Sequence, residues 1–211
     1  MERIVKILKI LAKHQGKTML AKFSKYDPFK ILIGTVLSQR SRDETTESLT
    51  EQLFRKYHNM NELANAKQNE LEKVIKKSGF YRNKAKNIIA ISRIILEKYK
   101  GRVPDDFEKL LEMPGVGRKT AGCVLVYAFS RPALPVDTHV HRVSNRLGIV
   151  KTKTPEKTEL ALMKIVPKKY WVLVNDLLVY HGKSVCKPIK PNCRVCEIEK
   201  YCSYKTKSFS F

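Results

Sequence analysis

Residues 111–121 read LEMPGVGRKTA and lie between two segments in which apolar residues recur at helical spacing. Gly115 and Gly117 flank a single apolar residue, Val116. Because glycine reaches backbone angles that other residues avoid, this run predicts a very tight turn between two helices, with Val116 packed between them as an anchor. The amides of the two glycines would face outward at the start of the second helix, where a phosphate binds well. The alternative is an ordinary turn between helices, but the basic residues that follow favour a phosphate site.

Helix start and stop signals recur along the rest of the chain. Asp27-Pro28 and Thr154-Pro155 each place a capping side chain before a proline, which is typical of a helix N-terminus, and Asp43 is expected to cap another helix. Glycines follow several apolar runs, and no stretch alternates apolar and polar residues for long enough to predict a sheet. The sequence therefore predicts an all-α fold of about ten helices joined by short turns. The helices are expected near residues 29–37, 43–57, 71–75, 85–99, 105–112, 118–129, 138–147, 155–166 and 171–180, the last of them followed by Gly182.

The chain is strongly basic. Its 211 residues include 42 Lys and Arg against 20 Asp and Glu, for a formal net charge of +22 and a pI near 9.9. A folded chain with this imbalance repels itself unless a polyanion is near, so nucleic acid is the leading partner. The alternative is a lysine-rich host composition. The basic residues are spread along the chain, which favours a folded basic face over a disordered arm, and no apolar run approaches membrane-spanning length.

Four cysteines near the C-terminus form the pattern C-x6-C-x2-C-x5-C. Such close spacing gathers four thiolates around one centre, as a tetrahedral zinc ion or an iron–sulfur cluster requires. Disulfides are the alternative, and they need an oxidising compartment. The N-terminal sequence MERIVKILKIL opposes that alternative, because Lys6 and Lys9 interrupt any apolar signal core. Spacing alone leaves zinc and a cluster undecided; the candidate ligands are Cys186, Cys193, Cys196 and Cys202.

Four stretches, in order along the chain, resemble the endonuclease III family of DNA glycosylases. Residues 37–43, LSQRSRD, resemble an early helix junction of that family, and the turn at residues 111–121 is similar to its helix–hairpin–helix. Residues 136–140, VDTHV, resemble its catalytic-aspartate segment. The four-cysteine loop is similar to its [4Fe-4S] cluster loop in spacing and in position, so the resemblance implies an iron–sulfur cluster and not zinc. The resemblance covers the chain from about Asp27 to Cys202.

The resemblance implies two catalytic residues. Lys119 matches the family's nucleophilic lysine, whose amine attacks the sugar C1′, expels the base and remains attached as a Schiff base. Arg118 and the positive start of the helix are expected to lower the pKa of Lys119. Asp137 matches the family's carboxylate, which stabilises positive charge on the sugar. On the residues alone, Lys119 is as well read as one of many phosphate-contacting lysines, and Asp137 is a sound helix N-cap before Thr138.

A base inside duplex DNA must be flipped out before a lysine can reach its sugar, and another group must fill the gap. The resemblance places the filling residues at Arg40 and Phe80. Arg40 stands where the common bacterial pattern has Gln, so the preference for the opposite base is expected to differ. Phe80 also fits the alternative of a core contact beyond a helix stop. The predicted DNA contacts in full are Arg40, Phe80, Gly115, Val116, Gly117, Arg118, His139, Lys187, Lys190 and Arg194.

The resemblance also implies two helical domains. One covers residues 22–131 and holds the helix–hairpin–helix. The other is discontinuous, covers residues 1–21 and 132–211, and holds the cluster loop. DNA would lie in the groove between them.

The predicted function is that of a base-excision-repair DNA glycosylase with AP-lyase activity, which removes oxidised pyrimidines and cleaves the strand at the abasic site. The nearest rival is a monofunctional mismatch or adenine glycosylase, although such relatives usually lack a lysine at the position of Lys119. A rival from another class is a non-catalytic, metal-bearing DNA-binding module. The expected partner is duplex DNA with damaged bases or abasic sites. The protein is expected to be a monomer without a membrane partner, in the cytoplasm and nucleoid of a prokaryotic, archaeal host.

Overall fold

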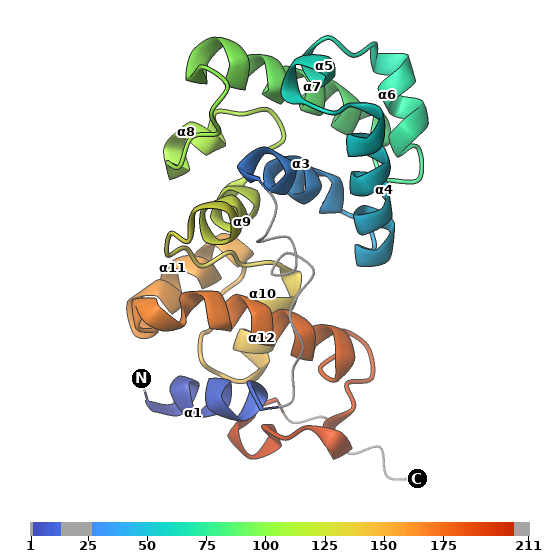
Figure 1. The fold of residues 1–211 in the computed structure, drawn as a ribbon. Helices are drawn as coiled ribbons and strands as arrows, with labels where there is room; N and C mark the ends of the chain where they lie inside the picture. Colours follow the sequence, from blue (N-terminus) through green and yellow to red (C-terminus); the bar gives the residue numbers. More distant parts are fainter. Residues whose placement is uncertain (1, 14–26, 205–211) are drawn as a thin grey trace. The chain divides into compact units, whose positions relative to one another are not determined.

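The computed structural model describes residues 2–13 and 27–204. These residues contain eleven α-helices and no strand, so the predicted all-α fold is confirmed (Figure 1). They divide into two compact units: a central unit of residues 27–131 and a terminal unit of residues 2–13 with 132–204. The boundary predicted between residues 21 and 22 lies outside the described residues. None of the described helices is long and apolar enough to cross a membrane.

The central unit is built around one apolar helix. This helix, α3, packs against α4, α7 and α9, and its residues 29–37 except Lys30 are all buried. A helix that is apolar on every side must be covered on every side, which explains its place. It starts as predicted, because the Asp27 carboxylate accepts hydrogen bonds from the backbone N–H of Phe29 (2.9 Å) and Lys30 (3.2 Å). The helices of this unit are α3 (Pro28–Ser38), α4 (Asp43–Lys56), α5 (Met60–Ala64), α6 (Gln68–Ile75), α7 (Tyr81–Tyr99), α8 (Phe107–Leu111) and α9 (Arg118–Phe129).

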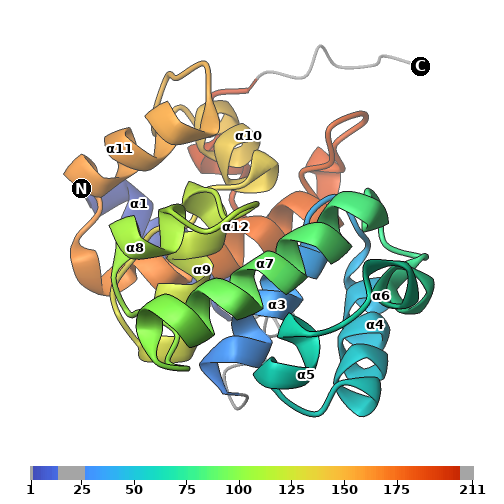
Figure 2. The ribbon, with the colours of Figure 1, turned by 90° about the horizontal axis from the view of Figure 1, so that it is seen from above.

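Two helix starts in the central unit differ from the sequence prediction. The cap predicted at Asp43 is wrong by one residue. Arg42 is the cap residue, because its carbonyl accepts the first helical hydrogen bond, from the Thr46 N–H (3.0 Å), and its side chain makes no capping bond. Helix α5 was not predicted, since five residues are too short to show a periodic pattern. Its signal is the capping pair Asn59 and Glu62, in which the Glu62 N–H donates to Asn59 Oδ1 (3.0 Å). Helix α7 lies against α3, α5 and α6 (Figure 2).

The terminal unit joins the first helix of the chain to the last ones. Helix α12 packs against α1 and α10, and α10 packs against α11 (Figure 1). Ile198, from the cysteine loop, is fully buried in the same apolar core and fastens that loop to the helices. The elements are α1 (Glu2–Leu11), α10 (Thr138–Arg146), α11 (Pro155–Ile165), α12 (Trp171–Ser184) and the 3₁₀ turns η2 (Lys168–Tyr170), η3 (Cys193–Val195) and η4 (Glu199–Tyr201).

The predicted end of the last helix is wrong. Helix α12 does not stop near Tyr180 but continues through Gly182 to Ser184. Gly182 is there because the packing of α10 requires it: a Cβ at this position would lie 2.9 Å from Cβ of His139 and 3.2 Å from a guanidinium nitrogen of Arg142. The glycine thus marks a close helix contact and not a helix end.

Candidate functional site

The turn between α8 and α9 uses its two glycines differently. Gly115 has a φ of +76°, which favours glycine, and a Cβ there would also displace the end of the Asn87 side chain, whose Nδ2 would lie 2.3 Å away. Gly117 has a φ of −94° and a ψ of 177°, which any residue adopts, and nothing lies within 4 Å of a Cβ built on it. Val116 between them is buried, as predicted, and its N–H donates to the Met113 carbonyl (3.1 Å). The fold alone therefore does not explain the second glycine.

Helix α9 begins at this turn without a side-chain cap. Gly117 occupies its cap position and offers no side-chain acceptor to the first amides of the helix. Arg118 and Lys119 are its first two residues, and both are half-buried. The Arg118 guanidinium lies 4.8 Å from the ring centroid of Phe107 on α8, which holds it beside the turn. The start of α9 thus combines uncapped amides, the positive end of the helix dipole and two cations, which suits an anion.

Helix α10 begins with a side-chain cap. Oδ1 of Asp137 accepts from the N–H of His139 (2.8 Å) and of Val140 (2.9 Å), so the carboxylate is held in one orientation. Both capping bonds use Oδ1, which leaves the cap independent of Oδ2. The predicted capping role of Asp137 is confirmed. Asp137 is half-buried, so a rigid carboxylate is presented at the start of the helix.

His139 packs tightly at the second position of α10. It is half-buried, and its Nδ1 lies 3.2 Å from a guanidinium nitrogen of Arg142. Burial lowers the pKa of His139 below its ordinary value of 6.5, and this outweighs the opposite effect of the Asp137 carboxylate. The side chain is therefore a neutral imidazole at neutral pH.

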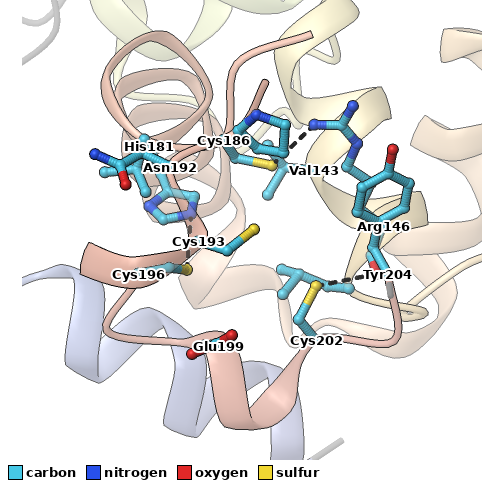
Figure 3. Close-up of a pocket in the computed structure, with 13 residues that line it drawn as sticks. Val143, Arg146, His181, Cys186, Asn192, Cys193, Cys196, Glu199, Cys202 and Tyr204 are labelled. Atoms are coloured by element: carbon cyan, nitrogen blue, oxygen red, sulfur yellow. Dashed lines mark hydrogen bonds between the residues drawn. The ribbon is translucent and has the colours of Figure 1, made fainter. Parts of the chain in front are cut away.

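The four predicted ligands surround one cavity of about 340 Å³ in the terminal unit. In Figure 3 their sulfur atoms face a common space. Cys186 follows the end of α12, Cys193 begins η3, Cys196 follows η3, and Cys202 follows η4. All five cysteines of the chain lie among the described residues and are free of disulfides. Within the described part of the chain, no three His, Cys, Asp or Glu side chains are grouped tightly enough to hold a metal ion. The residues that line the cavity include Cys186, Cys193, Cys196, Cys202, His181, Arg146 and Tyr204.

Burial favours the neutral form of two thiols of this cavity. Burial raises the pKa of Cys196 to about 11 and also raises that of Cys202. Nε2 of His181 lies 3.7 Å from Cys196 Sγ, and burial lowers the pKa of that histidine. Because a ligating cysteine must be a thiolate, a cationic centre would have to displace protons from these sulfurs on binding.

Two arginines that sequence reasoning missed fasten the cysteine loop to α10. Arg142 donates to the carbonyls of Cys186 (3.0 Å) and Gly182 (2.8 Å). Arg146 donates to the Lys187 carbonyl (2.7 Å) and to Cys186 Sγ (3.4 Å). Their spacing of four residues on one helix, ahead of a four-cysteine loop, is the signal that was available. The loop that they hold presents Lys187, Lys190 and Arg194, all exposed.

Arg40 and Phe80 meet in the central unit. The Arg40 guanidinium lies 5.0 Å from the ring centroid of Phe80, which is 60% exposed. Phe80 is therefore not a core residue, and the alternative reading of this residue is wrong. Both residues have positive φ angles, 51° for Arg40 and 58° for Phe80, which are uncommon outside glycine. The structure thus brings together Arg40, Phe80 and the glycine turn within the central unit, while Asp137, His139 and the cysteines belong to the terminal unit.

Comparisons with known proteins agree with this arrangement of motifs. A family model described as "HhH-GPD superfamily base excision DNA repair protein" matches residues 33–168. The chain is 55% identical to the endonuclease III of Thermotoga maritima over 178 residues, 84% of each chain. Its fold resembles a non-covalent endonuclease III–DNA complex (TM-score 0.89, 37% identity, 96% of this chain and 94% of the other). It also resembles a trapped endonuclease III–DNA covalent intermediate (TM-score 0.83, 36% identity, 94% of each chain). The chain therefore belongs to the endonuclease III family, within the HhH-GPD superfamily of base excision DNA repair proteins.

Proposed function

We propose that this protein is a bifunctional enzyme of base excision repair, a DNA glycosylase and AP lyase that acts on oxidised pyrimidines in duplex DNA. The observation that carries the proposal is the position of Lys119. It is the second residue of a helix that starts at a glycine turn without a side-chain cap, in a chain of the endonuclease III family. The monofunctional rivals usually lack a lysine at this position.

The chemistry assigned to Lys119 needs one primary amine. The amine attacks C1′ of the damaged nucleotide: a C–N bond forms, the glycosidic bond breaks, and the base leaves with the electron pair and takes up a proton. Opening of the sugar ring at C1′ then gives an imine between C1′ and Nζ. The imine makes the C2′ protons acidic, so loss of one proton expels the 3′ phosphate by β-elimination. Water hydrolyses the imine and returns the lysine.

Asp137 is assigned to the same reaction. Its carboxylate stabilises the positive charge that grows on the sugar as the base departs, and it assists proton movement to the leaving group or the lysine. The hydrogen bonds from His139 and Val140 support this role, because they fix the carboxylate without engaging Oδ2.

DNA contacts are assigned to three groups of residues. The amides at Gly115 and Gly117, with Arg118, bind phosphate next to the lesion, because the start of α9 is uncapped and positive. Arg40 and Phe80 fill the gap left by the flipped nucleotide, which the exposure of Phe80 and its stacking on Arg40 support. Further phosphate contacts are assigned to Lys187, Lys190 and Arg194, which are exposed on the cysteine loop, and to His139.

The cysteines are assigned to a [4Fe-4S] cluster. The donor set of four thiols around one cavity of about 340 Å³ fits such a cluster. Cys186, Cys193, Cys196 and Cys202 would hold it. A cluster with four cysteine ligands has no open position for substrate, so it would order the loop that carries the basic residues.

The partner is duplex DNA with damaged bases or abasic sites, bound by a monomer in the cytoplasm of a prokaryote; the archaeal host stays a prediction.

Borohydride trapping tests the proposal. The protein is mixed with an oligonucleotide duplex that contains one abasic site, and borohydride is added. Because borohydride reduces the imine to a stable amine, we expect a covalent protein–DNA band on a denaturing gel. Lys119→Ala should abolish the band, and Lys86→Ala, which removes an exposed lysine from α7, should leave it intact. A wild-type protein that neither cuts the duplex nor forms the band would overturn the proposal.

A further inference from the structure

Lys84 is a buried lysine that the proposed reaction does not use. It lies on α7, is 3% exposed, and burial lowers its pKa to about 8. Its ammonium donates to the carbonyls of Leu37 (2.8 Å) and Gln39 (2.5 Å) and to the hydroxyls of Ser41 (3.2 Å) and Ser78 (2.7 Å). All four acceptors are uncharged oxygens. Burying a cation against neutral groups is costly, and a well-packed apolar side chain would serve stability better, which points to a geometric role.

Three of the four acceptors, Gln39, Ser41 and Ser78, come from two loops that are distant in the sequence, and the fourth, Leu37, lies in the last turn of α3. The first loop, residues 39–42, joins α3 to α4, and the second loop, residues 76–80, joins α6 to α7. The hydroxyls of Ser41 and Ser78 also lie 3.0 Å apart. At Gly79, an added Cβ would lie 2.7 Å from the carbonyl oxygen of Arg40, so the loops touch through their backbones. Lys84 therefore fastens the first loop to the second.

Each loop contributes one member of an exposed pair, Arg40 and Phe80, here called the wedge pair. Left-handed backbone at a residue other than glycine is strained and persists only where surrounding contacts enforce it. Both members of the pair have it. Phe80 gains little from burial, and a hollow of about 330 Å³ opens beside the pair. The hydrogen bonds of Lys84 are contacts of this kind, because they join the two loops that carry the pair.

The same network reaches the helix that carries Lys119. The Gln39 side chain donates through Nε2 to the Gly115 carbonyl (2.8 Å), and the same Nε2 lies 3.2 Å from Oγ1 of Thr120, the residue after Lys119. The backbone carbonyl of Gln39 is at the same time an acceptor for Lys84. A continuous set of hydrogen bonds therefore runs from beneath the wedge pair, through Lys84 and Gln39, to the start of α9.

We propose that Lys84 is a positioning residue, which holds the wedge pair in a fixed geometry relative to the start of α9. The inference rests on the proposed function, because it assigns the wedge pair to the gap in the duplex and Lys119 to the flipped nucleotide. With the wedge pair and Lys119 held at a fixed separation, the pair fills the gap while the sugar of the flipped nucleotide lies within reach of the Lys119 amine. Lys84 acts through these groups and touches no DNA.

Two substrates separate this role from a structural one. A duplex with one oxidised pyrimidine requires base flipping and gap filling, whereas an abasic site in a single strand requires neither. For Lys84→Met we expect the single-turnover excision rate on the duplex to fall about 10²-fold, because small misplacements near a reacting centre have effects of that size. Imine trapping on the single strand should stay within about threefold of wild type. Lys86→Met, which removes an exposed lysine from the same helix, should match wild type on both substrates.

A double-mutant cycle identifies the groups through which Lys84 acts. If Lys84 works by holding the wedge pair, then adding Lys84→Met to Phe80→Ala should cost less than about threefold more, because coupled residues are not additive. Ser78→Ala removes one acceptor and keeps the lysine. Its excision rate on the duplex should fall about tenfold, while trapping on the single strand should stay near wild type. This variant tests the role of Lys84 even if Lys84→Met does not fold.

Equal losses on both substrates, or additive losses with Phe80→Ala, would overturn the role of Lys84. So would a Lys84→Met protein with the duplex rate of wild type. These results leave trapping by the wild-type protein intact. If instead wild type itself forms no imine, the proposed function fails, and the inference fails with it.

Discussion

The starts of α9 and α10 carry the two proposed catalytic residues, and they are built in opposite ways. Helix α9 begins at Gly117 with no side-chain cap, whereas α10 begins at Asp137, which accepts two backbone hydrogen bonds. The second residue of the first helix is Lys119, and the second residue of the other is His139. The cap residue of α9 supplies no side-chain acceptor to the first turn of its helix, whereas the cap residue of α10 supplies one.

The difference shows how a helix start can serve either stability or binding. A side-chain cap stabilises a helix by a few tenths of a kcal/mol relative to glycine, and α9 lacks such a cap at a position where the backbone accepts any residue. A start of this kind is free to receive a phosphate, while a capped start instead presents a fixed carboxylate. Sequence motifs locate both starts, but only the geometry shows that Gly117 is not required by the fold.

The largest expected effect separates the capping role of Asp137 from its proposed chemistry. Asn is as good a helix cap as Asp, so Asp137→Asn should keep the thermal midpoint of wild type. The excision rate should fall about 10²- to 10⁴-fold, because the negative charge is lost. Asp137→Ala should lose the same activity and also about 1 kcal/mol of unfolding free energy. Single-turnover kinetics and thermal denaturation of both variants measure this, and full activity of Asp137→Asn would reduce Asp137 to a cap.

A smaller effect is expected when α9 is given the cap that α10 has. In Gly117→Asp the new carboxylate should occupy the first amides and repel phosphate, so affinity for an abasic-site duplex should fall about tenfold or more. The unfolding free energy should rise by a few tenths of a kcal/mol from the new cap, and to about 0.5 kcal/mol when the attraction between the carboxylate and the helix dipole is included. Fluorescence anisotropy and denaturation measure the two changes. Gly117→Ala is the control, since it adds a Cβ without a charge; unchanged DNA affinity in the Asp variant would show that the amides bind no phosphate.

The smallest effect concerns the pH dependence of α10. Because the pKa of His139 lies below 6.5 in the folded protein, the unfolded chain binds more protons between that lowered pKa and pH 6.5. The unfolding free energy should therefore fall as the pH drops from 7 through this window and level off below it. His139→Gln should remove this part of the slope. Denaturation at several pH values tests the slope, and an NMR titration midpoint of His139 at or above 6.5 would contradict it.

Local sequence patterns predicted much of the fold and of the site. Asp27, Asp137 and Thr154 were predicted as helix caps, and all three accept backbone hydrogen bonds in the structure. The family assignment is confirmed as well. The catalytic roles of Lys119 and Asp137 and the identity of the metal centre stay predictions. The end of α12 is predicted wrongly because a glycine such as Gly182 signals both a helix end and a close contact, and only the neighbouring helix distinguishes them. Helix α5 is missed for a different reason, since five residues are too short to show a period.

The sequence by itself determined most of the helices, the glycine turn, the four-cysteine loop and the excess of positive charge, because each depends on residues that are near one another in the chain or on composition. Only the tertiary structure decided that Lys84 is buried among four oxygens, that Gln39 reaches the glycine turn, and that Arg142 holds the cysteine loop. These contacts join residues about 40 or more positions apart, except for Ser78, and such distant pairs leave no period or spacing in the sequence. The sequence around a helical lysine is the same whether its ammonium is solvated or bound by two loops, and only the packing of the folded chain distinguishes the two cases.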